Sequence, residues 1–385
     1  MAEFKHFDLK IVAPEFDSPL INLIIELDKL RERVLYGSTK PIIFYQLKQI
    51  FHMLESLASA RIEGNNTTVA DYIETKIEQS SKSNDMQFRE IQNMEVCLDF
   101  IEENIEDSKI DRAFISELHK IVTKDLPFKN KGEGDETPGA YRSKQVSIAN
   151  SSHIPPEPVT VYSYMEELCE FIKTEHESKY DLLKTSLVHH RFVWIHPFNN
   201  GNGRTVRMLT YAMLIKYGFS VQAEVGRILN PAAVFCNDRK EYYAKLALAD
   251  TGTDENVLKW CEYVLGGLKK EIEKIDRLLK YDFLKSKILV PAIVHALDRA
   301  WITEIEFRVL KKAIDKQIIK AADLSDVIHT RHLPERSRII RRLKDKKMLI
   351  SVSGSPRKYA ICFQNNYLIR GIIEQLSKEG FVSVN

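Results

Sequence analysis

The chain has 385 residues, of which 44% are hydrophobic and 29% are charged. This length suits two or three domains, and the composition excludes a wholly disordered chain. The net charge of +2 hides an asymmetry: residues 284–385 hold 20 of the 56 basic and 10 of the 54 acidic residues, so they carry +10, while residues 1–283 carry −8. Such a difference predicts a basic interaction module joined to a more acidic body.

The five cysteines are scattered and form no C-x-x-C pair. This spacing favours neither a disulfide framework nor a zinc site, and it indicates a reducing compartment. The N-terminus lacks the basic region and apolar run of a signal peptide, and no apolar stretch approaches the roughly 18 residues of a membrane span. We therefore expect a cytoplasmic protein that does not associate with a membrane.

Apolar residues recur with helical spacing through most of residues 1–283. One run follows Pro19 and ends near Gly37, and the next follows Pro41 and ends at Gly64. Further helical patterns cover about residues 69–80, 86–104, 111–124, 160–175, 181–195, the stretch after 203, and a long charged run from about 254 to 283. The body of the protein is therefore predicted to be mainly α.

Residues 127–158 interrupt this pattern, because they are rich in glycine and proline. They surround a short segment, Lys144–Ile148, whose composition favours a β-strand. We expect a loop region that contains one short strand.

The strongest chemical signal is the segment HPFNNGNGRTVR, residues 196–207, between two helical patterns. Gly201 and Gly203 let backbone N–H groups converge, and a helix that begins there adds its unpaired N–H groups and its positive end. Arg204 and Arg207 project beside this cradle, where guanidinium groups suit phosphate oxygens. His196 stands just upstream, in the place of a general base. The segment predicts a polyphosphate site with an acceptor to deprotonate.

Each of these features has an ordinary structural interpretation when taken alone. A G-x-G is usually a turn, and a histidine beside a helix is usually a cap or a core residue, but their order over twelve residues favours a site. Phe198 is expected to be a core anchor for the loop. His189 and His190 lie inside a helical pattern and are expected to be structural.

From about residue 285 onward the pattern changes to three helices followed by a hairpin. The predicted helices are Ile302–Ile314, Ile318–Ile328 and Leu333–Met348, and the predicted strands are Leu349–Val352 and Lys358–Cys362. This order resembles a winged helix-turn-helix. Its third helix carries seven cations: Arg336, Arg338, Arg341, Arg342, Lys344, Lys346 and Lys347. Two interpretations remain open, contact with DNA phosphates or a platform for protein interaction and dimerisation.

Residues 196–207 resemble the signature of the Fic (Fido) family, H-x-F-x-[D/E]-G-N-G-R-x-x-R. Pro138–Arg142, followed by Val146, Ser147 and Ile148, resembles the family's flap, a β-hairpin that aligns a target segment by strand addition. The pair Tyr242–Tyr243 resembles the lining of the nucleotide pocket. The resemblance covers about residues 110–250, with a related helical region before it.

The resemblance implies a mainly α protein, with a Fic-type helical bundle, a β-hairpin flap and the C-terminal winged helix-turn-helix. The implied domains are an N-terminal helical region at 1–109, a catalytic domain at 110–283 and a winged-helix-like domain at 284–385. It permits a homodimer.

The activity implied is that of a protein adenylyltransferase, a nucleotidyltransferase that moves AMP from ATP to a Ser, Thr or Tyr hydroxyl of a target protein or of itself. By position, His196 would deprotonate the hydroxyl, while Arg204 and Arg207 would bind the β- and γ-phosphates. The remaining nucleotide-binding residues would be Gly201, Asn202, Gly203 and Tyr242. Charge on the leaving group favours a divalent cation, most plausibly Mg²⁺.

Asn200 departs from the family pattern, because it occupies the position of the acidic metal ligand. An amide oxygen is a weaker ligand for Mg²⁺ than a carboxylate. Three outcomes stay open: a weak but working site, a different nucleotide substrate, or lost transferase activity. We favour the first, since every other position of the motif is retained.

Ser59–Asn65 is by itself an ordinary helix end with Gly64 as a left-handed cap. Beside the Fic signature it resembles the family's inhibitory motif, [S/T]-x-x-x-E-[G/N]. The resemblance implies that Glu63 pairs with Arg207 and so competes with the γ-phosphate. The leading hypothesis is thus an autoinhibited adenylyltransferase. The alternative is a DNA-binding regulator whose Fic-like body binds nucleotide with weak or no transfer.

Overall fold

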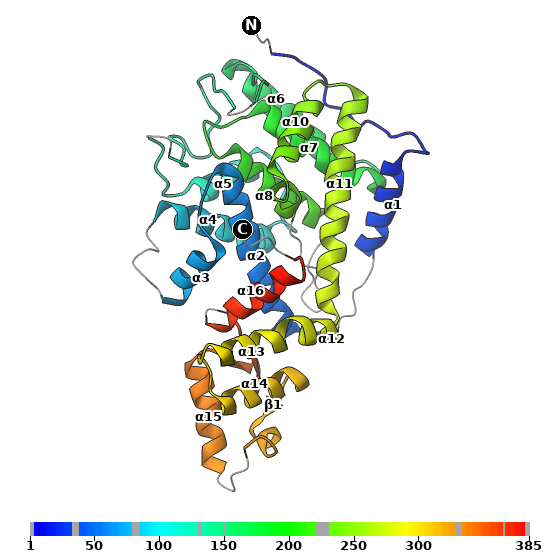
Figure 1. The fold of residues 1–385 in the computed structure, drawn as a ribbon. Helices are drawn as coiled ribbons and strands as arrows, with labels where there is room; N and C mark the ends of the chain where they lie inside the picture. The colour runs from blue at the N-terminus through cyan, green and yellow to red at the C-terminus, as the bar shows by residue number, and fades with distance from the viewer. Residues whose placement is uncertain are drawn as a thin grey trace.

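The computed structural model describes residues 4–32, 38–78, 85–129, 132–148, 151–219, 231–328, 333–364 and 366–381, and these are mainly helical (Figure 1). Over these residues, none of the helices combines the length and the apolar character of a membrane span. The first eleven helices are α1 (Pro19–Glu32), α2 (Pro41–Glu63), α3 (Val69–Glu78), α4 (Met86–Asn104), α5 (Arg112–Thr123), α6 (Pro158–Lys173), α7 (Asp181–Ile195), α8 (Asn202–Lys216), α9 (Pro231–Cys236), α10 (Arg239–Ala249) and α11 (Asp254–Asp276).

The ends of these helices follow local sequence signals. Asp85, Asp111 and Asp238 each accept a hydrogen bond from a first-turn N–H group and so cap α4, α5 and α10. Gly64 closes α2 with φ of 108°, a left-handed conformation that glycine adopts without a steric penalty. A helix is present within each range predicted in this part of the chain, but α11 ends at Asp276, so the helix predicted to continue to residue 283 is too long. The helix ends predicted near residues 37 and 80 lie outside the described residues.

A first hydrophobic core surrounds the antiparallel pair α7 and α8, which α4, α5, α6 and α11 enclose. Phe192, Phe198 and Trp260 are among its fully buried side chains. Five free cysteines are present, and four of them are buried. This core fixes the two ends of the loop that joins α7 to α8.

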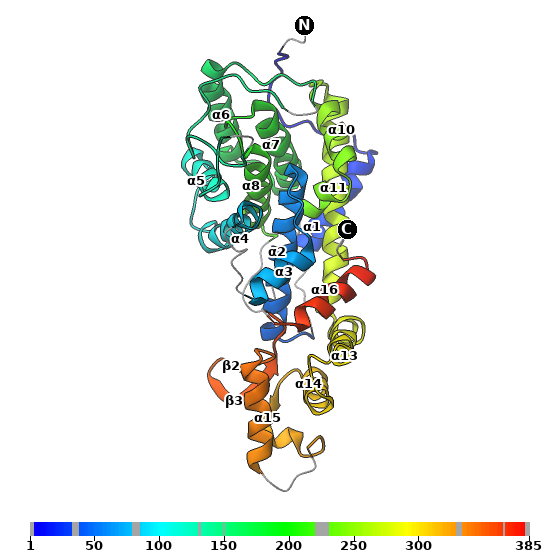
Figure 2. The same ribbon diagram turned by 60° about the vertical axis from the view of Figure 1, so that its left-hand side comes forward.

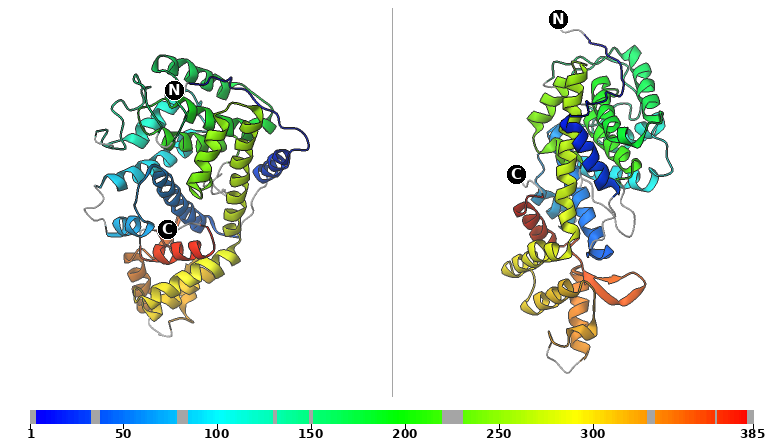
Figure 3. Two further views of the ribbon diagram at one scale, coloured as in Figure 1. Left: turned by 45° about the horizontal axis from the view of Figure 1, so that its top comes forward. Right: turned by 90° about the vertical axis from the view of Figure 1, so that its right-hand side faces the viewer.

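The C-terminal module, residues 281–381 as far as described, contains a small sheet and further helices. Its elements are α12 (Tyr281–Phe283), a π-helical segment (Leu284–Leu289), α13 (Val290–Asp298), α14 (Glu304–Lys316), β1 (Ile319–Lys320), a 3-10 turn (Ala321–Leu324), α15 (Leu333–Asp345), β2 (Leu349–Val352), β3 (Ser355–Ile361) and α16 (Leu368–Lys378). The sheet is antiparallel in the order β1-β3-β2, with Ile319 opposite Tyr359 and Leu349 opposite Ile361. The β2–β3 hairpin projects from the molecule (Figure 3).

The helix predicted over Ile318–Ile328 is wrong. Gln317 ends α14 with φ of 60°, and the chain then forms β1 and the 3-10 turn. The Asp323 carboxylate accepts the Lys320 N–H at 2.7 Å and closes that turn. The apolar period was misleading because Ile319 is buried through pairing with β3, a partner that lies 40 residues away.

The strand predicted over Val146, Ser147 and Ile148 is also not present, since residues 144–148 adopt no regular structure. Side chains hold this part of the chain instead: Gln145 Nε2 donates to the Pro155 carbonyl at 2.9 Å. Along 145–148 the side chains still alternate between exposed and half-buried, as they would in a strand. A strand needs a neighbour for its backbone groups, and the described residues supply none here.

A second hydrophobic core joins the C-terminal module to α2, α3 and the start of α4. Buried residues of α2 from Ile43 to Ala60 share it with Leu284, Leu310 and Phe363. The domain boundaries expected near residues 109 and 283 stay a prediction, but this core crosses both of them.

Glu306 on α14 is a fully buried carboxylate that organises the module. It accepts the Thr303 N–H at 2.7 Å in a capping box. Arg342 and Lys346 form ion pairs with it at 2.7 and 2.9 Å. Two of the seven cations predicted on the third helix are therefore directed at Glu306.

We expect Glu306→Ala to lower the free energy of unfolding by about 2 kcal/mol. The variant loses the hydrogen bond to the start of α14 and the ion pairs with Arg342 and Lys346. Urea denaturation followed by circular dichroism measures this loss. Glu304→Ala is the control, since Glu304 is an exposed neighbour that only pairs with Arg308 four residues on. Equal losses in the two variants would contradict the organising role of Glu306.

Candidate functional site

The loop between α7 and α8 reverses the chain through two left-handed residues. His196 ends α7 with φ of 50°, and Gly201 precedes α8 with φ of 72°. Asn202 clasps the loop, because its amide accepts from the Phe198 N–H and donates to the Phe198 carbonyl, both at 2.9 Å. Asn202 was predicted to bind nucleotide, and in this structure its side chain holds the loop.

His119 on α5 contacts the loop between α7 and α8 and holds it in place. Sequence reasoning missed this residue. Its ring stacks on Phe198 with centroids 3.7 Å apart and an interplanar angle of 3°. The Gly139 N–H donates to Nδ1 at 2.8 Å, so the proton lies on Nε2, which donates to the Asn200 carbonyl at 3.0 Å. Burial lowers the pKa of His119 to about 4, so the ring is neutral at pH 7.

Asp135 is the second residue that sequence reasoning missed. Its buried carboxylate accepts the N–H groups of Asn199 and Asn200 at 3.1 and 3.2 Å. It also accepts the Thr137 N–H at 2.8 Å, which makes an Asx turn. The Asp-x-Thr order within a glycine-rich segment was a sequence signal for that turn. It did not indicate that the carboxylate also binds the loop between α7 and α8.

The amide of Asn200 is committed to the backbone. Its Nδ2 donates to the carbonyls of Gly132 and Gly134 at 2.9 and 3.3 Å, and its Oδ1 accepts the Gly201 N–H at 2.8 Å. A carboxylate could not donate these two bonds. The described residues also contain no cluster of three or more His, Cys, Asp or Glu side chains able to hold a metal. This donor set does not fit a metal ion held by Asn200.

Glu63 reaches the start of α8 and forms an ion pair with Arg207, with Oε1 and Nη2 2.7 Å apart. Ser59 binds the same guanidinium, since its Oγ accepts from Arg207 Nε at 2.6 Å. A Cβ added at Gly203 would overlap Glu63 Oε1, so the carboxylate occupies the space that this glycine opens. The predicted contact between Glu63 and Arg207 is confirmed, and a carboxylate fills the anion cradle.

Burial alone would raise the pKa of Glu63, but the guanidinium groups of Arg207 and Arg204 outweigh it and hold the pKa below its ordinary value. The Glu63 side chain is 26% exposed and that of Arg207 only 1%. Glu63 is therefore ionised at neutral pH and neutralises a buried cation.

Arg204 is also fully buried, and carboxylates hold its guanidinium. It pairs with Glu90 on α4 at 3.2 Å and with Glu133 at 3.0 Å. Its Nη2 also donates to the Glu133 carbonyl at 2.6 Å. Glu90 is in turn fixed by Asn65 at 2.8 Å. Both predicted phosphate ligands are thus charge-balanced by protein carboxylates.

His196 is brought beside this cluster, and burial lowers its pKa to about 4. Its carbonyl accepts from Arg142 Nε at 2.9 Å, and the Arg142 N–H donates to the Pro197 carbonyl at 2.8 Å. Arg142 also donates to the Pro156 carbonyl at 2.6 Å. One buried guanidinium therefore ties the predicted flap to the end of α7. His196 is neutral at pH 7 and able to accept a proton.

Tyr242 is almost fully buried, with 2% of its surface exposed. Its hydroxyl bonds to His189 Nε2 at 2.9 Å, and His189 Nδ1 bonds to Thr210 at 2.8 Å. The expectation that His189 and His190 are structural is confirmed, because His190 pairs with Asp250 at 2.9 Å. The nucleotide-binding role of Tyr242 stays a prediction.

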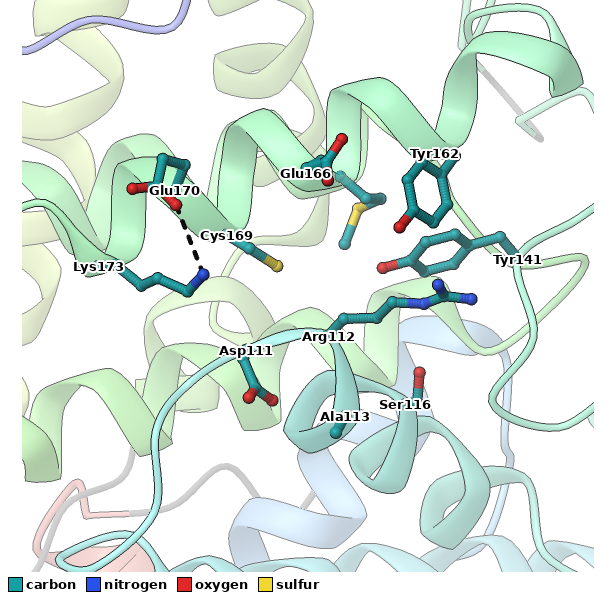
Figure 4. Close-up of a pocket in the computed structure, with 11 residues that line it drawn as sticks. Asp111, Arg112, Ala113, Ser116, Tyr141, Tyr162, Glu166, Cys169, Glu170 and Lys173 are labelled. Carbon is teal, nitrogen blue, oxygen red and sulfur yellow. Dashed lines mark hydrogen bonds and ion pairs between the residues drawn. The ribbon is translucent and has the colours of Figure 1, made fainter.

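A pocket of about 490 Å³ opens between α5 and α6 (Figure 4). The Arg112 guanidinium lies 5.0 Å from the ring centroids of both Tyr141 and Tyr162. Tyr141 also contacts Phe198, with ring centroids 5.7 Å apart. Tyr141 belongs to the predicted flap segment, but none of the predicted catalytic, nucleotide-binding or inhibitory residues lines this pocket.

Residues 109–214 match the family model described as Fic/DOC family. The chain is 31% identical over 199 residues to a protein adenylyltransferase Fic from Drosophila virilis, and 32% identical over 200 residues to one from Drosophila melanogaster. Each match covers 50% of this chain and 37% or 36% of the relative, so the chain spans little more than a third of the curated relatives it matches.

The fold resembles that of a Fic family protein from Desulfovibrio desulfuricans, with a TM-score of 0.53 and 19% identity. That match covers 91% of this chain and 98% of the other. It supports the mainly helical Fic-type fold as predicted.

We expect Asp135→Asn to loosen the loop, because an NH₂ group would face the N–H groups of Asn199 and Asn200. Hydrogen exchange at these two amides should quicken by about tenfold or more, the effect of losing buried hydrogen bonds to a charged acceptor. The control is Glu136→Gln at the exposed neighbouring position. Unchanged exchange in Asp135→Asn would remove its positioning role.

Proposed function

We propose that the chain is a protein adenylyltransferase that moves AMP from ATP to a hydroxyl side chain of a target protein or of itself, because residues 109–214 match the Fic/DOC family model. The names of the Drosophila relatives support this activity. The observation that carries it is the cradle at Gly203, where the start of α8 and the buried Arg207 already hold one anion, the Glu63 carboxylate.

In the proposed reaction, the hydroxyl oxygen of the target attacks the α-phosphorus of ATP. The bond from that phosphorus to its bridging oxygen breaks, and pyrophosphate leaves with the electron pair. His196 takes the hydroxyl proton. The backbone N–H groups at Gly201 and Gly203 stabilise the negative charge of the phosphates, and so does the guanidinium of Arg207. They act because the fold already holds them in place.

Arg204 and Asn202 support this reaction less directly than the family pattern implies. Asn202 holds the loop through Phe198, and Arg204 is held by Glu90 and Glu133. A β-phosphate would have to compete with Glu133, whose side chain is 38% exposed. Magnesium has no step here, because the amide of Asn200 is committed to Gly132, Gly134 and Gly201.

We further propose that the chain is autoinhibited by Glu63. A γ-phosphate and the Glu63 carboxylate would require the same guanidinium, and only one anion can hold Arg207 in the bidentate manner that phosphate prefers. Ser59 strengthens the proposed inhibited state, in which Glu63 pairs with Arg207, because Ser59 lies on the same helix and accepts a hydrogen bond from Arg207. ATP would thus bind productively only when the end of α2 moves away.

We expect Glu63→Gly to raise the initial rate of AMP incorporation by about tenfold or more, because the competing carboxylate is gone. ATP labelled at the α-phosphate gives this rate, because autoradiography detects the label on the protein itself and on proteins of an added cell extract. Glu63→Gln separates charge from backbone effects, and an intermediate rate is expected for it. Equal rates in wild type and Glu63→Gly would remove the inhibitory role.

His196→Ala in the Glu63→Gly background tests the chemistry itself. Loss of the general base should lower incorporation by about a hundredfold or more. If nucleotide binds to Glu63→Gly but no label is incorporated, the alternative holds, namely a regulator that senses nucleotide without transferring it.

A second function is favoured by the exposed cations of the C-terminal module. We infer that residues 304–361 form a winged helix-turn-helix, since α14, β1, α15 and the β2–β3 hairpin follow that order. Arg338, Arg341 and Lys344 are exposed on α15. Arg357 and Lys358 are exposed on the hairpin. We call these five residues the cationic face and propose that it contacts DNA phosphates.

Filter binding to a duplex at a series of salt concentrations tests this contact. We expect the affinity to fall as salt rises, and Arg338→Ala with Arg341→Ala to reduce the salt slope by about two. Arg308→Ala is the control, because this exposed cation lies on α14 and pairs with Glu304. No binding at low salt would exclude the DNA contact.

A further inference from the structure

The helix that carries Glu63 lies between the body of the protein and the C-terminal module, and it contacts both. Its buried apolar residues from Ile43 to Ala60 lie in the second core, and Ile62 alone lies in the first. Figure 2 shows α2 running from the module toward α8. The proposed inhibitory residue therefore stands at the end of a 23-residue helix that the module contacts near its start and that α4, α8 and α9 contact as well.

Gln46 joins α2 to the sheet of the module. Its Nε2 donates to the Ile361 carbonyl at 2.9 Å, and its Oε1 accepts the Phe363 N–H at 2.9 Å. The side chain is 3% exposed, so both bonds are shielded from water. This amide occupies the place of a neighbouring strand at the end of β3, and we call it the Gln46 clasp.

The start of α2 is held by the module as well. Gln317, the residue after α14, accepts the Lys40 N–H at 2.7 Å and donates to the Ser38 carbonyl at 2.8 Å. Ser38 Oγ accepts the Tyr281 N–H at 2.8 Å. The helix thus has fixed contacts at its start and at Gln46, while its other end lies in the anion cradle.

The strand β3 links this clasp to the cationic face. Arg357 and Lys358 lie near its beginning, and Ile361, its last residue, is in the clasp. From Arg357 to Ile361 the strand spans about 13 Å, and from Gln46 to Glu63 the helix spans about 26 Å. Two rigid elements and one buried amide therefore connect the cationic face with Arg207.

Resting on the proposed autoinhibition, we propose that the C-terminal module sets the strength of the Glu63–Arg207 contact through the Gln46 clasp. The module holds α2 in the position that places Glu63 in the cradle. A change at β3 alters that position, and by linkage a nucleotide that expels Glu63 alters the module in return. The site then has a regulatory input outside the Fic/DOC domain.

Gln46→Leu tests the proposal, because leucine keeps the volume in the core and removes both hydrogen bonds. We expect the full-length variant to incorporate labelled AMP about fivefold faster than wild type, the lower end of ordinary coupling between sites. Its Kd for ATP should fall by about the same factor. In the Glu63→Gly background, Gln46→Leu should change neither quantity, because the contact it weakens is already absent.

Gln49→Leu is the comparison variant, since Gln49 lies on the exposed side of the same helix and accepts from the Gln364 side chain of the module. We expect a smaller effect than that of Gln46→Leu, because this bond is exposed to water. Gln317→Ala is a second variant, which weakens the hold on α2 outside the core and is expected to act in the same direction. Thermal unfolding verifies that each variant is folded.

Folded variants with wild-type rate and wild-type ATP affinity would overturn the proposal. If Glu63→Gly proves inactive, the proposed transferase function fails, but the change in ATP affinity still tests the clasp. A rise in rate for Gln46→Leu that persists undiminished in the Glu63→Gly background would also overturn it.

Discussion

The site depends on one buried charge, the guanidinium of Arg207, which is 1% exposed. A buried cation is costly unless an anion and further hydrogen bonds accompany it. Ser59 and Glu63 supply both from a single helix: Ser59 accepts a hydrogen bond from Arg207, and Glu63 provides the anion. The buried charge of Arg207 therefore ensures that a protein carboxylate, that of Glu63, occupies the space beside it.

The same reasoning extends to the neighbouring charges. Arg204 holds Glu90 and Glu133, so the start of α8 has two cations and three carboxylates around it. In the proposed function, these carboxylates compete with the phosphates of a nucleotide for both guanidinium groups. The proposal has nucleotide bind productively after α2 has moved, because removing Glu63 frees the cradle and the Arg207 guanidinium together.

Sequence alone predicted the parts of this site that local chemistry decides. The glycines of the loop and the structural roles of His189 and Phe198 follow from short segments. The contact of Glu63 with Arg207 joins residues 144 apart, and only the family resemblance implied it. The roles of His119, Asp135 and the Asn200 amide depend on backbone groups 64 to 81 residues away. The false helix at 318–328 and the absent flap strand have the same origin, since strand pairing is a tertiary property.

A second carboxylate on α2 shows how far the influence of Arg207 reaches. Burial raises the pKa of Glu55 to about 8. The Ala232 N–H, which donates to this carboxylate at 2.8 Å, and the charge of Arg207 both lower the pKa, but burial outweighs them. Glu63 instead keeps a pKa below its ordinary value, because it touches the guanidinium. Arg207, with Arg204, keeps the touching Glu63 carboxylate ionised but does not offset the burial of Glu55. The helix therefore ends with a negative charge at the position that we propose for the γ-phosphate.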